Sequence, residues 1–167
     1  MNVLEFKKTI SSTFREILVS KALVGNYNAY VSLKGTRVGL EWADAGDIDA
    51  SEMTSYIPFK STGQIFTLFR AGTHIARHID DSSNRTSCLS IALLPSLDKF
   101  APVTYYDSLD DNSSVSETYH YTVQPVILNT TKVHAMYNNE HDRYVFQVQY
   151  AEPIDDFIPF ANIIEQP

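Results

Sequence analysis

The feature that most constrains the fold is a series of short β-type segments, separated by turn residues, that runs from Tyr27 to Tyr150. Each segment is rich in β-branched and aromatic residues and is short enough to be a single strand. The segments cover residues 27–33, 37–42, 63–70, 73–79, 85–94, 103–106, 118–128, 132–137 and 143–150. Many short strands at regular spacing are typical of an all-β sandwich or barrel. We therefore expect a mainly β fold.

The first 25 residues show a different pattern. Apolar residues recur there at roughly helical spacing, and Gly25 follows the last of them as a helix-terminating glycine would. These residues are Val3, Leu4, Phe6, Ile10, Phe14, Ile17, Leu18 and Leu23. The pattern predicts an amphipathic helix over residues 1–25 that covers one face of the sheet.

The chain length of 167 residues fits one domain with a sizeable core. We find no internal repeat and no linker, so we expect a single domain over residues 1–167 with its barrel core at about 63–150. Residues 107–117 are polar and rich in Asp, Ser and Asn, which predicts an exposed loop.

The net charge of −7 argues against a nucleic-acid partner, because phosphate contacts need clustered Lys and Arg, and no such run occurs. The opening segment carries charges where a signal peptide needs an apolar core, and no apolar run approaches membrane-spanning length. We therefore expect a soluble, cytoplasmic protein with no membrane partner. The only cysteine, Cys88, lies in an apolar stretch, which predicts a buried and inert thiol.

Three residues form a candidate metal site: His78, Asp80 and His134. Residues two apart on a strand point to the same face, so His78 and Asp80 can reach one ion. His134 lies 56 residues after His78 on another expected strand. Two imidazoles and one carboxylate on one side of an ion leave the opposite positions open. This facial arrangement is typical of non-haem Fe(II) oxygenases.

The His-x-Asp motif alone is weak evidence, since roughly one match in three chains of this composition is expected by chance. Arg143, nine residues after His134, strengthens it. Arginine binds a carboxylate through two parallel hydrogen bonds. Flanked by Tyr144, Val145 and Phe146, this arginine would be costly to bury without an anion.

The segments HIDDSSNRTSCLSIALLP and PVILNTTKVHAMYNNEHDRYVFQVQY resemble the 2-oxoglutarate/Fe(II) dioxygenases, most closely the aspartyl/asparaginyl β-hydroxylase-like branch. The resemblance covers roughly residues 63–150. It implies a double-stranded β-helix, which is a jelly-roll, cupin-like barrel with the metal in its mouth. It also implies hydroxylation of a substrate with Fe(II), 2-oxoglutarate as cosubstrate and O₂.

The same resemblance assigns roles to individual residues. His78, Asp80 and His134 match the iron ligands, and Arg143 matches the arginine that pairs with the distal carboxylate of 2-oxoglutarate. Arg85 falls near a second arginine that helps to hold the cosubstrate, although an ion pair with Asp80 or Asp81 is an equal alternative. Thr67 falls where that branch can place a hydroxyl near the cosubstrate.

Two other functions fit the same barrel: a non-catalytic, cupin-like binding or structural module, and a different metal enzyme such as a Zn or Mn isomerase or hydrolase. The triad together with Arg143 favours the oxygenase. The substrate carries no readable signature in the sequence, and a protein side chain, a free amino acid or another small molecule all remain open.

Overall fold

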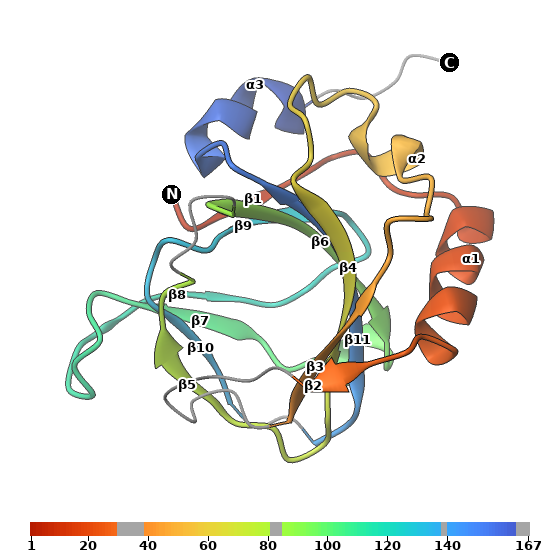
Figure 1. Cartoon of the computed structure of the whole chain (residues 1–167). Coiled ribbons are helices and arrows are strands. Elements are labelled where there is room, and N and C mark those ends of the chain that lie inside the picture. The colour runs from red at the N-terminus through yellow and green to blue at the C-terminus, as the bar shows by residue number, and fades with distance from the viewer. Residues whose placement is uncertain (30–38, 81–84, 138–139, 163–167) are drawn as a thin grey trace.

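The computed structural model describes residues 1–29, 39–80, 85–137 and 140–162. Short strands dominate it (Figure 1). The strands are β1 (Val3–Glu5), β2 (Asn28–Ala29), β3 (Leu40–Asp44), β4 (Gly63–Phe69), β5 (Ile75–His78), β6 (Ser87–Leu94), β7 (Val103–Tyr106), β8 (Val115–Tyr119), β9 (Val126–Asn129), β10 (His134–Met136) and β11 (Arg143–Tyr150). The helices are α1 (Ser12–Leu23), α2 (Ser51–Thr54) and α3 (Ile158–Ala161), with 3-10 turns η1 (Leu97–Lys99) and η2 (Ile154–Phe157).

The strands form two antiparallel sheets that face each other. The larger has seven strands in the order β1-β9-β6-β11-β4-β3-β2, and the smaller has four in the order β5-β10-β7-β8. The central strand β11 pairs along its whole length with β4 on one side and β6 on the other. Helix α1 contacts β6 and β11 from outside the larger sheet, while the smaller sheet lies across the interior (Figure 1).

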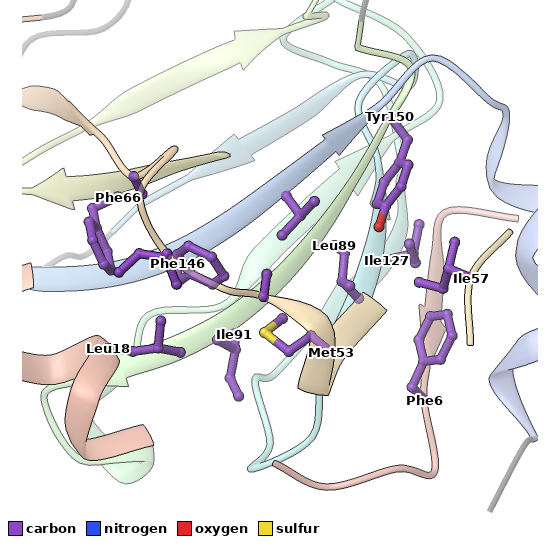
Figure 2. Packing of buried hydrophobic residues seen from close by; sticks show 14 of the residues in the cluster. Phe6, Leu18, Met53, Ile57, Phe66, Leu89, Ile91, Ile127, Phe146 and Tyr150 are labelled. Atoms are coloured by element: carbon purple, nitrogen blue, oxygen red, sulfur yellow. The ribbon is translucent and has the colours of Figure 1, made fainter. Parts of the chain in front are cut away.

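The outer face of the larger sheet carries the main hydrophobic core. Alternate residues of β11, including Phe146 and Val148, point outward and are almost fully buried beneath the helices. Leu18 of α1 and Met53 of α2 pack against this face together with Ile91 of β6 (Figure 2). At about 25 cal/mol per Å² of apolar area removed from water, such packing is the main stabilising contribution to the fold.

A second, smaller cluster fills part of the space between the sheets. The larger sheet contributes Phe69 and Val145 to it, and the smaller sheet contributes Val103, Tyr105 and Met136. The two sheets thus enclose an interior that is partly apolar core and partly a pocket lined by both apolar and polar side chains.

Three expected segments differ from the structure. The expected loop over residues 107–117 ends early, because strand β8 begins at Val115. The expected helix over residues 1–25 is wrong in its first half, because Val3–Glu5 forms strand β1 against β9 and the helix begins at Ser12. Ser11 caps the helix, with its hydroxyl accepting a hydrogen bond from the Phe14 backbone N–H. The expected strand over residues 118–128 is two strands, β8 and β9, which belong to different sheets. Residues 120–125 cross between the sheets, and Pro125 has no N–H for a ladder.

The other expected strands are present within a few residues of their predicted bounds, and β11 has the predicted bounds. The expected pairing of residues 27–33 with 37–42 is seen where β2 meets β3, whereas residues 30–38 lie outside the described part of the chain. Within the described ranges, the helices are all too short, or too polar, to cross a membrane.

Candidate metal centre

The two histidines of the expected triad lie opposite each other on adjacent antiparallel strands. His78 ends β5, His134 begins β10, and the two residues are partners in the register of this pair. Their ring centroids are 4.3 Å apart. Asp80 follows just beyond β5, where its backbone N–H donates to the Thr130 carbonyl at 3.0 Å. Strand pairing therefore brings together residues that are far apart in the sequence.

The ligand atoms of the three side chains converge. His78 Nε2 lies 3.6 Å from Asp80 Oδ1, and His134 Nε2 lies 3.8 Å from Asp80 Oδ2. One ligand atom from each residue lies within 4.8 Å of the other two. Neighbouring ligands bonded at about 2.0–2.2 Å to one ion would be about 3 Å apart, so small side-chain shifts suffice to close the site on a metal.

The backbone fixes which nitrogen each imidazole offers. Nδ1 of His78 lies 2.8 Å from the Ala76 carbonyl oxygen, and Nδ1 of His134 lies 2.8 Å from that of Lys132. A carbonyl oxygen only accepts, so each Nδ1 must carry a proton and donate it. In the neutral imidazoles the lone pair is then on Nε2, the atom that faces Asp80. This is the usual arrangement of metal-ligating histidines.

Arg85 forms an ion pair with the carboxylate of the triad. Its Nη2 lies 2.9 Å from Asp80 Oδ2, and the two side chains are only 15% and 11% exposed. Of the two roles left open by the sequence, the ion pair with Asp80 is present in the structure. Asp81, the other acidic residue considered as a partner, lies outside the described residues.

The triad lines a pocket between the two sheets. Arg85 and Thr67 line the same pocket, together with the single tryptophan, Trp42. The buried Thr67 hydroxyl donates to Gln147 Oε1 at 2.7 Å across from the triad's sheet. The remaining lining residues are Leu40, Ile65, Phe69, Ile75, Cys88, Val103, Tyr105, Tyr121, Leu128, Asn129, Thr130, Ala135, Met136 and Gln147. Five residues predicted from the sequence therefore share this pocket: His78, Asp80, His134, Arg85 and Thr67.

Arg143, the sixth predicted residue, lies one side chain behind the pocket wall. It is 0% exposed, and its guanidinium carbon lies 4.6 Å from the ring centre of Phe69, a wall residue, and 4.9 Å from that of Phe100. One N–H donates to the Ala101 carbonyl at 2.5 Å, while Nε and Nη2 have no hydrogen-bond partner among the described residues. Burial lowers the pKa of Arg143 to about 10, which leaves it protonated at neutral pH.

Cys88 is buried, as predicted, and burial raises the pKa of its thiol to about 11. The thiolate is the reactive form of cysteine, so this environment favours an inert group.

Two residues of the site, Thr130 and Gln147, were not predicted from the sequence. The backbone carbonyl of Thr130 accepts a hydrogen bond from the Asp80 N–H. Every residue has such a carbonyl, so the sequence cannot reveal this contact. Gln147 had a usable signal, because it shares strand parity with Arg143 on β11 and is polar where a buried interior position is normally apolar.

Comparison with solved structures shows which known fold the chain resembles. A Pseudomonas putida prolyl-4-hydroxylase superposes with a TM-score of 0.61 at 13% identity, covering 89% of this chain and 91% of that one. HygX from Streptomyces hygroscopicus, solved with nickel, 2-oxoglutarate and hygromycin B, gives 0.61 at 10% identity, covering 92% and 83%. The fold is that of the 2-oxoglutarate/Fe(II) oxygenases. A Trichoplax adhaerens prolyl hydroxylase, solved with a hypoxia inducible factor peptide fragment, also gives 0.61, at 12% identity and 89% and 83% coverage.

The predicted fold class, a mainly β double-stranded β-helix with an N-terminal helix, is therefore confirmed. No protein-family model matches the sequence, and no curated protein matches it either. At such low identity the likeness to 2-oxoglutarate oxygenases is one of fold, and the aspartyl/asparaginyl β-hydroxylase-like branch stays a prediction.

Proposed function

We propose that this protein is an Fe(II)- and 2-oxoglutarate-dependent oxygenase that hydroxylates a small molecule or a protein side chain. The observation that carries the proposal is the convergence of His78, Asp80 and His134, with both Nε2 lone pairs directed at the carboxylate, inside an oxygenase fold.

The chemistry of the donor set fits Fe(II). Two neutral imidazoles and one carboxylate are the ligands of the non-haem Fe(II) facial triad, and they leave open positions for a cosubstrate. All three ligands come from β5, β10 and the residues just after β5, so they approach from the side of the smaller sheet. The opposite side faces the pocket wall that the larger sheet forms with Trp42, Thr67 and Gln147.

Arg143 supplies the cation that a dicarboxylate cosubstrate needs. A buried guanidinium whose Nε and Nη2 have no hydrogen-bond partner among the described residues is costly, and an anion that enters the interior would relieve this cost. In the proposed complex, the distal carboxylate of 2-oxoglutarate reaches Arg143 past Phe69 and Tyr121, both of which line the pocket. The Thr67 hydroxyl is a further hydrogen-bonding group along this path.

Bound iron, with 2-oxoglutarate and O₂, supplies the oxidising chemistry of hydroxylation. The chain's own share is to hold the metal ligands, to orient the cosubstrate and to keep bulk water from the reacting atoms. Apolar wall residues such as Ile75, Val103 and Leu128 serve the last of these tasks.

The test is an anaerobic titration of the purified protein with Fe(II) and then 2-oxoglutarate, followed by exposure to O₂ and measurement of succinate. The single tryptophan lines the pocket, so its fluorescence reports both binding steps. We expect saturable binding of both ligands and slow succinate formation without added substrate. Metal binding without 2-oxoglutarate binding would favour another metal enzyme in the same barrel, and binding of neither would leave a non-catalytic module.

A further inference from the structure

The two oxygens of the Asp80 carboxylate have different neighbours. Arg85 Nη2 contacts Oδ2 at 2.9 Å, and His134 Nε2 lies 3.8 Å from the same oxygen, whereas Oδ1 lies 3.6 Å from His78 Nε2. An arginine–carboxylate hydrogen bond between charged groups is among the stronger polar contacts in proteins, the more so where both partners are largely shielded from water. Arg85 is therefore well placed to restrain the orientation of the Asp80 carboxylate.

Thr130 fixes both ends of the segment that carries this ion pair. Its carbonyl accepts from the Asp80 backbone N–H at 3.0 Å, and its hydroxyl donates to the Arg85 carbonyl at 2.9 Å. Its own N–H donates to the Thr86 carbonyl at 3.1 Å. One residue just after β9 thus ties Asp80 and Arg85 to the same point of the larger sheet.

We propose that Arg85 is a positioning residue that holds one oxygen of Asp80, so that the carboxylate offers a metal the other oxygen alone, with Thr130 fixing the pair. This inference rests on the proposed function of the site. It assigns Arg85 to the metal ligand and leaves the cosubstrate carboxylate to Arg143.

The reason lies in the number of coordination positions. A carboxylate can bind a metal through one oxygen or through both. A metal held by two histidines and by one oxygen of the aspartate would keep more positions open for a cosubstrate than a metal held by both aspartate oxygens. A guanidinium on Oδ2 prevents binding through both oxygens while also offsetting the aspartate charge before metal binds.

The decisive experiment compares metal affinity in Arg85→Met and the wild type. Methionine keeps an unbranched, flexible side chain but removes every hydrogen-bond donor. Loss of a group that holds a metal ligand typically weakens metal binding about 10–100-fold, and we expect that range for Mn(II) and Co(II) under anaerobic conditions. Arg85→Lys should recover part of the loss, and the visible bands of Co(II) in Arg85→Met should differ from those of the wild type.

Arg70→Met is the matched control, since Arg70 forms ion pairs with Glu41 and Asp142 at the surface. Its metal affinity should equal that of the wild type. Thr130→Val removes only the hydroxyl bond and should weaken metal binding less than Arg85→Met does. If Arg85→Met fails to fold, Arg85→Lys and Thr130→Val still test the proposal through the same affinity and the same Co(II) spectrum.

The second measurement is 2-oxoglutarate affinity at saturating metal, which should fall together with the metal affinity in Arg85→Met, because an aspartate bound through both oxygens would take a position that the cosubstrate needs. Unchanged metal affinity in the Arg85 variants would overturn the inference, and a selective loss of 2-oxoglutarate affinity would assign Arg85 to the cosubstrate instead. A wild-type protein that binds no divalent metal would defeat the proposed function itself, so the two failures are distinguishable.

Discussion

Strand β11 presents two different surfaces from one run of eight residues. On its outer face Phe146, Val148 and Tyr150 are buried against helices and apolar side chains. On its inner face Arg143 and Gln147 are polar, although Arg143 is as completely buried as Phe146. The alternation of a β-strand makes this division possible, because neighbouring residues point to opposite sides of the sheet.

The two faces have different roles. The outer face contributes to stability, and the inner face is suited to binding. The outer face follows the rule that buried groups are apolar and closely packed. The inner face breaks that rule with a buried guanidinium that has only one hydrogen bond, to the Ala101 carbonyl, among the described residues. Local departures from favourable packing are expected where a site must bind something. Mutations on the two faces should therefore have opposite consequences.

The largest expected effect is on turnover, from Asp80→Ala. Removing the carboxylate takes away the single anionic ligand of the triad, so iron-dependent conversion of 2-oxoglutarate to succinate should be abolished. The fold should remain, because both hydrophobic clusters lie outside the triad. Succinate assays and thermal unfolding test the two parts, with Asp80→Asn as a control that keeps the side-chain shape. Equal succinate from the variant and the wild type would remove the site from catalysis.

The next effect is on stability, from Phe146→Ala on the outer face. Phe146 is fully buried and its ring centre lies 5.4 Å from that of Phe66. Truncating a buried phenylalanine typically costs about 3–5 kcal/mol in the free energy of unfolding, and urea denaturation should show a loss in this range. The metal affinity of the folded fraction should not change. A loss below about 1 kcal/mol would mean that the outer face is less important for stability than its packing indicates.

The residues of the candidate site could be predicted from the sequence more accurately than the secondary structure of the first residues. His78 and Asp80 are two apart, and the facing strands around them follow from local pattern, so their convergence with His134 could be predicted. Strand β1 could not be, because Val3 and Leu4 fit a helical spacing equally well. What makes them a strand is pairing with Ile127 and Leu128, more than a hundred residues away.

How deeply Arg143 is buried behind the pocket wall could also not be predicted from the sequence. Its position on β11 and its inward direction follow from strand parity, as expected from the spacing to His134. Its enclosure depends on Phe100 and Ala101, which lie about forty residues earlier in a segment without regular pattern. Tertiary contacts of this kind decide how far a side chain lies from a pocket, and no local motif records them.

Arg143→Met should weaken the binding of 2-oxoglutarate and raise the stability of the folded protein. Methionine removes a buried charge, so the free energy of unfolding of the ligand-free protein should rise by about 1 kcal/mol. Each hydrogen bond to a charged group is worth about 1.5–3 kcal/mol, so 2-oxoglutarate affinity should fall at least about tenfold. Calorimetric titration at saturating Mn(II) and urea denaturation measure the two effects. Unchanged 2-oxoglutarate affinity would mean that another residue anchors the cosubstrate, and Arg85 would then be the first candidate.

The smallest effect concerns Tyr150, where the outer face itself contains a buried polar atom. Its hydroxyl has no hydrogen-bond partner among the described residues, so Tyr150→Phe should leave stability at pH 7 unchanged or raise it by up to about 1 kcal/mol. Burial raises the pKa of Tyr150 above its ordinary value of 10. Above pH 10 the unfolded chain therefore loses this proton while the folded chain keeps it, so wild-type stability falls as pH rises. Tyr150→Phe should lose less stability than the wild type between pH 8 and pH 11, as measured by urea denaturation. Parallel curves for the two proteins would show that this hydroxyl is hydrated in solution.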